Sequence, residues 1–178
     1  LKIKFYHKSQ ADLKEMLLLK DPKGANALFL SQDEEIFNFL FEKVYCEHFK
    51  LEEFIFVTKN DGENLFYNLA KYGTALMLKK VTDKLMEELS YTKFMNLIRL
   101  KNKAQQNIFH AAATHNKSTE SLTYLLTKLN KDDVKKMLME MDENYLIPLQ
   151  SVVMENTAEN FKILFKFYQN NFSEREVV

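Results

Sequence analysis

Glycine and proline are scarce in this chain of 178 residues, which contains three glycines and two prolines. Loops that cradle phosphate groups need closely spaced glycines, and the sequence has no G-x-G-x-x-G, G-x-x-x-x-G-K-[ST] or G-x-S-x-G motif. These absences argue against nucleotide chemistry and against a hydrolase with a nucleophile elbow. Tryptophan is missing as well, so the 15 phenylalanines and eight methionines must supply much of any core.

Cysteine and arginine are equally rare. Cys46 is the single cysteine, which excludes an internal disulfide and a multi-cysteine zinc cluster and fits a reducing compartment such as the cytoplasm. Arg99 and Arg175 are the only guanidinium groups, and 25 basic residues balance 25 acidic ones. Because phosphate polymers select an excess of positive charge, we expect no nucleic-acid partner. No run approaches the roughly 18 apolar residues of a membrane span, so we expect no membrane insertion by this segment.

The titratable side chains form no catalytic or metal-binding motif. The four histidines, His7, His48, His110 and His115, lack the H-E-x-x-H spacing of zinc hydrolases. Glutamates occur in adjacent pairs, but neighbouring helical residues point about 100° apart and commonly serve solubility and helix caps. We therefore expect no enzymatic activity, no cofactor and no metal from these residues.

The chain does contain a pattern that recurs four times. Residues 26–29, 64–67, 107–110 and 147–150 align with one another, and the copies start 38, 43 and 40 residues apart. A polar turn is predicted before each copy, over residues 21–24, 59–62, 102–105 and 142–145. Glycine in the first two turns permits the positive φ of a tight turn. The glycines and prolines all fall in phase with this pattern: Pro22, Gly24, Gly62, Gly73 and Pro148.

Helical periodicity surrounds every copy. A short helix is predicted before each turn, over residues 13–19, 51–57, 94–100 and 134–139, and a longer amphipathic helix after each copy. The predicted buried faces of the longer helices are Ile36, Phe39, Leu40 and Val44; Leu78, Val81, Leu85 and Leu89; Leu122, Leu125, Leu126 and Leu129; and Phe161, Leu164, Phe165 and Tyr168. Further core positions are Leu28, Phe66, Phe109 and Leu149, together with Met16, Phe94 and Met137. The sequence thus predicts an all-α fold.

The order of turn, short helix, loop and longer helix resembles the ankyrin repeat, whose signature is D-x-x-G-x-T-P-L-H-x-A-A-x-x-G. Residues 61–73 follow this frame with both glycines, residues 107–113 restore its histidine and alanines, and Pro148 supplies its proline. The resemblance covers nearly the whole chain. It implies an ankyrin-like helical solenoid, with four stacked helix-turn-helix units over approximately residues 21–58, 59–101, 102–141 and 142–178.

Two features depart from the ankyrin pattern. The units run about 38 to 43 residues instead of about 33, because each gains an extra short helix, and asparagine or isoleucine replaces the signature threonine. Units of about 40 to 47 residues are typical of armadillo and HEAT solenoids, which remain the alternative. The chain begins at Leu1, and Ser173 and Glu176 have the spacing of a capping box that opens a further helix. We therefore expect an excerpt from a longer protein.

The resemblance also implies a function and a surface. Ankyrin repeats bind proteins or peptides through the turn tips and the outward positions of the first helix, on the concave face. The matching residues are Asn60, Asp61, Glu63, Asn68, Lys71 and Tyr72 in the second unit, Lys103, Gln106, Thr114 and His115 in the third, and Glu143, Asn144, Ser151, Met154 and Glu155 in the fourth. Their mixed chemistry favours a folded protein or an extended peptide as the partner.

A second hypothesis makes this segment the targeting or regulatory part of a larger toxin, effector or channel-type protein whose activity lies elsewhere. In either case His110 occupies the signature histidine position. The resemblance implies that its ring makes a structural hydrogen bond to the neighbouring turn.

Overall fold

The computed structural model describes residues 9–47, 49–116, 118–155 and 158–173, and this part of the chain folds into helices. Twelve helices occur there and no strand, apart from one isolated bridge between Thr58 and Asn64, so the all-α prediction is confirmed. Their bounds are α1 (Gln10–Leu18), α2 (Ala27–Leu30), α3 (Glu34–Cys46), α4 (Leu51–Ile55), α5 (Leu65–Tyr72), α6 (Ala75–Glu88), α7 (Tyr91–Ile98), α8 (Ile108–Thr114), α9 (Thr119–Lys128), α10 (Lys131–Leu138), α11 (Pro148–Glu155) and α12 (Ala158–Asn171). His7, His48, Arg175 and Glu176 lie outside the described residues.

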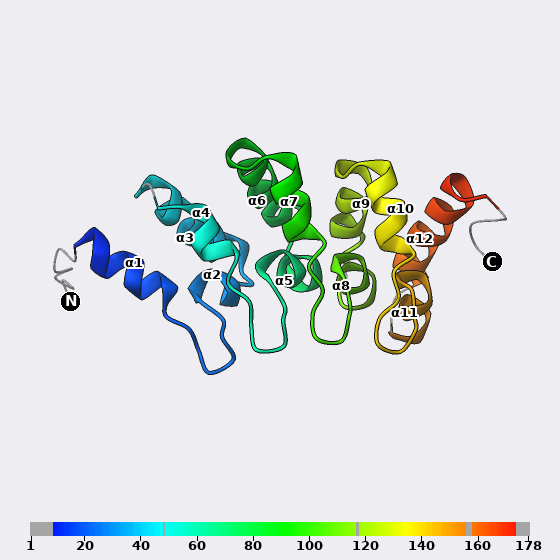
Figure 1. Cartoon of the computed structure of the whole chain (residues 1–178), viewed down its shortest axis with the longest axis horizontal. Coiled ribbons are helices and arrows are strands. Elements are labelled where there is room, and N and C mark those ends of the chain that lie inside the picture. The colour runs from blue at the N-terminus through cyan, green and yellow to red at the C-terminus, as the bar shows by residue number, and fades with distance from the viewer. Residues whose placement is uncertain (1–8, 48, 117, 156–157, 174–178) are drawn as a thin grey trace.

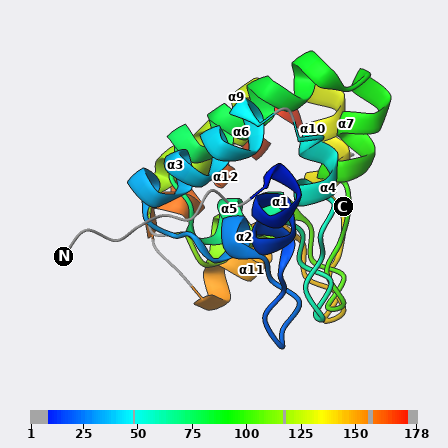
Figure 2. The same ribbon diagram turned by 90° about the vertical axis from the view of Figure 1, so that its left-hand side faces the viewer.

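The helices lie in three rows, which Figure 1 shows in chain order along the long axis of the molecule. We call α2, α5, α8 and α11 the inner row, α3, α6, α9 and α12 the outer row, and α1, α4, α7 and α10 the third row. Neighbours within the outer row contact one another, as do α5, α8 and α11 in the inner row, and α2 is bonded to α5 through Phe29 and Asn68. In the end-on view of Figure 2 the loops that precede the inner row project from the same side of the molecule.

Those loops contain the four predicted turns, and all four have the same backbone geometry. In each turn the amide of the fourth residue donates to the carbonyl of the first, at 2.9 Å for Gly24 and Gly62 and at 3.0 Å for Gln105 and Tyr145. These four residues all have positive φ, between 60° and 88°. Glutamine and tyrosine therefore adopt the left-handed conformation at the positions that glycine occupies in the first two turns.

Backbone hydrogen bonds also join each turn to the next. The amide of Asn60 donates to the carbonyl of Lys23 at 2.8 Å, and Lys103 donates to Asp61 at the same distance. The amide of Glu143 donates to Ala104 at 2.9 Å. The four turns form a continuous strip along one edge of the molecule.

The core runs between the rows and agrees with most of the sequence-based assignments. Leu28, Phe66, Phe109, Phe94 and Met137 are buried, and so are the predicted faces of α6 and α9. Leu149 is half-buried against the core.

The predicted face of α3 is wrong at two of its four positions, because Val44 is buried and Leu40 packs half-buried against the core. Ile36 and Phe39 are exposed, whereas Phe37 and Phe41 are buried beside Val44. Apolar residues surround most of α3, so their spacing does not distinguish the core side from the opposite side. Met16 in α1 and Phe165 in α12 were also assigned to the core and are exposed.

Candidate interaction surface

Three buried asparagines at the N-termini of inner-row helices hold the rows together. The side-chain oxygens of Asn26, Asn64 and Asn107 cap α2, α5 and α8 by accepting amide hydrogens from the first helical turn. Their side-chain amides donate to carbonyls of the following third-row helix: Asn26 to Phe54 at 3.3 Å, Asn64 to Leu97 at 3.2 Å and Asn107 to Met137 at 2.7 Å. A threonine at these positions could supply the cap but not the long side-chain amide.

His110 makes a structural hydrogen bond to the next turn, as predicted. Its Nε2 lies 3.0 Å from the carbonyl oxygen of Leu146, to which a proton on Nε2 donates. Nδ1 lies 3.2 Å from the backbone nitrogen and 2.9 Å from the side-chain oxygen of Asn107. The ring is fully buried. Burial lowers the pKa of His110, while the bond to Leu146 opposes that shift only in part.

The lowered pKa of His110 predicts that the protein is less stable in mild acid. An unfolded chain protonates this ring near pH 6.5, and below that value it binds a proton that the buried ring does not, so acid favours unfolding. The neutral ring of His110 contributes its full share of the stability above about pH 6.5. Below that pH we expect the free energy of unfolding to fall by up to about 1.4 kcal/mol per pH unit. Urea unfolding between pH 5 and pH 8 measures the slope. The variant His110→Gln should lose this part of the slope, and an unchanged slope would contradict the assignment.

Six of the residues predicted to contact a partner are exposed or half-exposed along the strip of turns. Asn60 and Asp61 lie at the tip of the second turn, Lys103 and Gln106 in and beside the third, and Glu143 and Asn144 at the tip of the fourth. Asn60 also donates from its side chain to the carbonyl of Pro22 at 2.9 Å. The structure therefore brings these six residues together along one edge. Tyr145, which the sequence did not single out, is 80% exposed beside them.

At the C-terminal ends of the inner-row helices, Tyr72 is exposed and His115 is half-exposed. The ammonium group of Lys71 lies 5.2 Å from the centre of the Tyr72 ring and 5.8 Å from that of Tyr67. Met154 is exposed on α11. The side chain of Glu155 lies outside the described part of the chain.

Four of the predicted contact residues are buried, and their polar groups bond within the chain. Asn68 donates to the carbonyl of Phe29 at 2.9 Å, Thr114 to that of His110 at 2.7 Å and Ser151 to that of Ile147 at 3.2 Å. Glu63 is the fourth. The ankyrin resemblance placed these four residues on the outward side of the units, whereas their side chains are buried.

Glu63 is the centre of a buried ionic cluster. Its carboxylate pairs with the ammonium groups of Lys59 and, at 2.8 Å, Lys71. Lys59 also pairs with Asp61 at 3.1 Å. Burial opposes the charge of each lysine, but the bonds to carboxylates outweigh burial and raise the pKa of Lys59 and of Lys71. Both lysines stay charged at neutral pH, so neither is suited to act as a general base.

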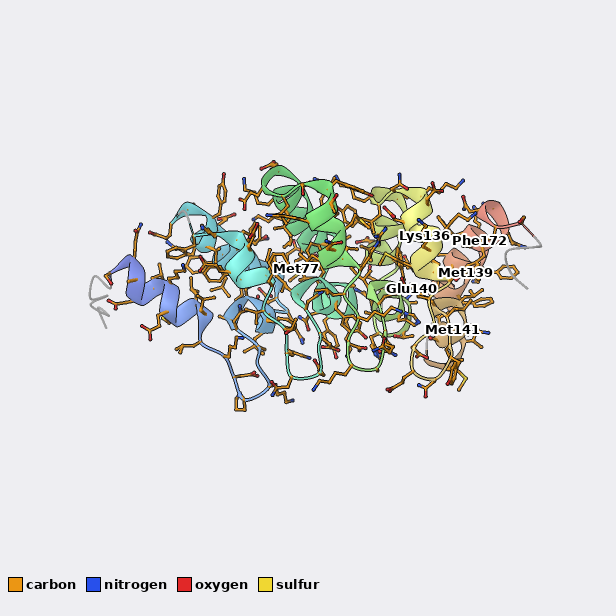
Figure 3. The ribbon with its side chains drawn as sticks, in the orientation of Figure 1. Met77, Lys136, Met139, Glu140, Met141 and Phe172 are labelled. Carbon is orange, nitrogen blue, oxygen red and sulfur yellow. The ribbon has the colours of Figure 1, made fainter. Side chains whose placement is uncertain are left out.

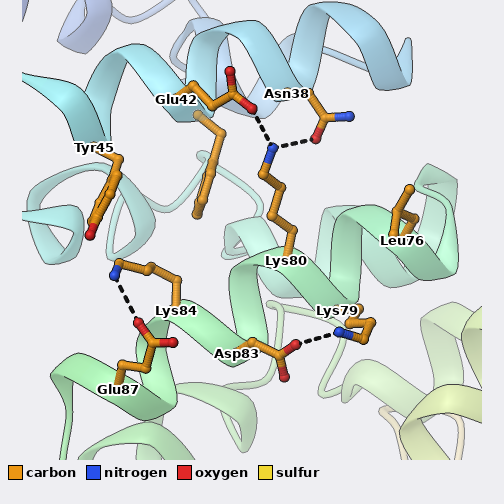
Figure 4. A pocket seen from close by; sticks show the side chains of 10 residues that line it. Asn38, Glu42, Tyr45, Leu76, Lys79, Lys80, Asp83, Lys84 and Glu87 are labelled. Carbon is orange, nitrogen blue, oxygen red and sulfur yellow. Dashed lines mark hydrogen bonds and ion pairs between the residues drawn. The ribbon is translucent and has the colours of Figure 1, made fainter.

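A groove between α3 and α6 holds several more titratable groups, and Figure 4 shows Lys80 reaching across it to α3 while the other two pairs lie within α6. Lys80 bonds to Glu42 at 2.9 Å and to Asn38 at 3.0 Å, while Lys84 bonds to Glu87 at 2.8 Å. The remaining pair joins Lys79 to Asp83 at 2.7 Å. These bonds raise the pKa of Lys79 and of Lys84. The groove therefore presents matched charges and no activated nucleophile or base.

Within the described ranges, no helix is both long enough and apolar enough to cross a membrane, and no three His, Cys, Asp or Glu side chains converge as a metal ion requires. No protein-family model matches this chain, and no curated protein matches its sequence.

Proposed function

We propose that the chain is an ankyrin-like solenoid of four stacked units and that it binds a protein or peptide partner without catalysing a reaction. The observation that carries this proposal is the strip of turns. Backbone bonds join each turn to the next, and a buried asparagine follows each of the first three, while Lys103, Glu143 and Asn144 lie exposed at the turn tips. A rigid scaffold with exposed tips at regular intervals suits binding to an extended surface.

The chemistry of the tips supports a protein or peptide partner. Lys103 is positive, Asp61 and Glu143 are negative, and Tyr72 adds an exposed aromatic ring at the end of α5. Aromatic side chains surrounded by polar groups are typical of protein interfaces. A strip of both signs attracts neither phosphate polymers nor anionic membranes by charge alone.

The proposed binding face is tested by replacing Tyr72 and His115 together with alanine. We expect the double variant to capture at least about tenfold less partner in a pull-down from cell extract, followed by direct titration of the partner identified. Its melting temperature should stay close to that of the parent, because Tyr72 is exposed and His115 lies partly at the surface. Tyr45→Ala is the matched control, since Tyr45 is 50% exposed and Tyr72 48%, but Tyr45 lies in the outer row. Equal capture by all three proteins would refute the location of the face.

A further inference from the structure

Buried hydrogen bonds tie α9 to the end of α5 and α12 to the end of α8. Asn116, just before α9, donates from its side-chain amide to the carbonyl of Ala70 at 2.9 Å. Ser121 in α9 donates to the carbonyl of Gly73 at 3.2 Å, and Asn160 in α12 donates to that of Asn116 at 2.9 Å. All three donors are buried. Because these groups are neutral, salt does not screen the bonds between them.

The equivalent position of α6 makes no such bond. Ser121 and Asn160 are the third residues of their helices, and the third residue of α6 is Met77. Met77, which Figure 3 labels, is fully buried, but a thioether sulfur carries no hydrogen to donate. The outer row is therefore joined differently between α3 and α6 than further along the chain.

Partly exposed side chains join α6 to α3 instead. The ammonium group of Lys80 donates to the carboxylate of Glu42 at 2.9 Å and to the side-chain oxygen of Asn38 at 3.0 Å. The hydroxyl of Thr74 donates to the carboxylate of Glu34 at 2.5 Å. The side chain of Lys80 is 31% exposed and that of Glu42 is 64% exposed. Attraction between exposed charges is weak and is reduced further by salt.

The bonds of Lys80 cross an open groove between the two helices. The groove has a volume of about 480 Å³ and is lined by the buried ring of Phe41, whose centre lies 5.8 Å from the ammonium group of Lys80. Figure 4 shows Lys80 reaching from α6 to α3 across it. Packing is also looser in the inner row here, because α2 has four residues and packs less closely against α5 than α5 packs against α8.

The turn side of the same junction is held by neutral hydrogen bonds. Asn60 donates from its backbone to the carbonyl of Lys23 at 2.8 Å and from its side chain to that of Pro22 at 2.9 Å. The buried side chain of Asn68 donates to the carbonyl of Phe29 at 2.9 Å. Figure 2 shows the loops with the turns on the opposite side of the molecule from α3 and α6. The junction is thus fixed at the turns and open at the outer row.

We propose that this junction is a hinge. The segment from α1 to α4 rotates against the segment from α5 to α12 about the first two turns, and the bonds of Lys80 to α3 hold the groove closed. High salt weakens that latch and opens the groove. Opening brings more of the Phe41 ring into contact with water, which limits how far the groove opens. The hinge is a property of the chain by itself and does not depend on the proposed partner.

Distances between spin labels on neighbouring outer-row helices test the hinge. The second residues of α3, α6 and α9 are Glu35, Leu76 and Glu120, all exposed, and they are replaced in pairs by cysteine in a Cys46→Ser background. Between about 0.01 M and about 1 M salt the Debye length falls from about 30 Å to about 3 Å. Double electron–electron resonance should show a longer and broader distance from position 35 to position 76 at high salt, and an unchanged distance from position 76 to position 120.

Reversal of charge tests the latch itself. Lys80→Glu and Glu42→Lys should each lengthen the distance between positions 35 and 76 at low salt, because like charges then face each other across the groove. The two changes together restore an opposite pair and should restore the parent distance. Lys128→Glu is the matched control, because Lys128 pairs with Asp83 across α6 and α9 at 2.8 Å. It should leave the distance between positions 76 and 120 unchanged, since the buried bond of Ser121 remains.

The hinge is overturned if salt and Lys80→Glu leave the distance between positions 35 and 76 unchanged, or if both distances lengthen alike. Failure of the double reversal to restore the parent distance would overturn the latch. Melting curves establish that each labelled variant is folded, so that a longer distance reports movement between the two segments and not unfolding.

Discussion

Replacing Asn107 with alanine is expected to lower the free energy of unfolding by about 2 to 4 kcal/mol. The side-chain oxygen accepts from the amides of Phe109 and His110, at 3.0 and 3.3 Å, and its loss removes the cap of α8. The side-chain amide donates to Met137 at 2.7 Å and to the carboxylate of Glu140 at 3.0 Å. Alanine therefore removes the shorter bond to the carbonyl of Met137, which keeps the longer bond from the amide of Glu140 at 3.4 Å, and this loss adds to the cost of the lost cap. Equilibrium urea unfolding measures the difference.

Two further variants separate the cap from the contact between rows. Asn107→Thr keeps a capping oxygen but cannot reach Met137 at the same time, so we expect a loss of about half that of alanine. Ser118→Ala removes the cap of α9, where the hydroxyl accepts only from Glu120 at 3.2 Å, and should cost about 1 kcal/mol. If Asn107→Ala costs no more than Ser118→Ala, the asparagine is a local cap and does not join the rows.

The turns and many of the buried apolar positions could be predicted because they depend on local chemistry. Gly24 and Gly62 mark the turns, and the spacing of leucines in α6 and α9 identifies one buried side. Helix starts were predicted less well: α1, α7 and α10 begin three residues earlier than their apolar spacing suggests. Ser9, Ser90 and Asn130 cap those earlier starts, and an amphipathic pattern does not register a cap.

The sequence pattern could not predict burial that depends on contacts between helices. Glutamate is usually a surface residue, but Glu63 is buried. Its two lysine partners lie four residues before it and eight residues after it in the sequence. Ile36 and Phe165 show the reverse, since their helical spacing predicts burial and both are exposed. The spacing of apolar residues shows which side of a helix is apolar, but it does not show which other helices pack against that side.

Replacing Gly62 with alanine is expected to lower the free energy of unfolding by about 2 to 3 kcal/mol. Its φ of 84° disfavours any residue with a Cβ atom. An added Cβ would also lie 3.1 Å from the backbone nitrogen of Lys103 and 3.3 Å from the Cα atom of Asn102, in the next turn. That nitrogen donates to Asp61 at 2.8 Å, so relief of the close contact would weaken the bond between turns.

The corresponding residue of the third turn is Gln105. Its replacement by glycine should raise the free energy of unfolding, whereas Gly62→Ala lowers it. Glutamine adopts a φ of 60° there, at a cost that glycine avoids, although glycine loses more backbone entropy on folding. We expect Gln105→Gly to raise the free energy of unfolding by about 0.5 to 1 kcal/mol, measured by urea unfolding beside Gly62→Ala. If the two variants change the free energy of unfolding in opposite directions, the feature common to the turns is the left-handed conformation and the bond to the next turn. Glycine is then only the residue that adopts this conformation at the lowest cost. A loss of stability in both variants would contradict that conclusion, because it would make the side chain of Gln105 a necessary part of its turn.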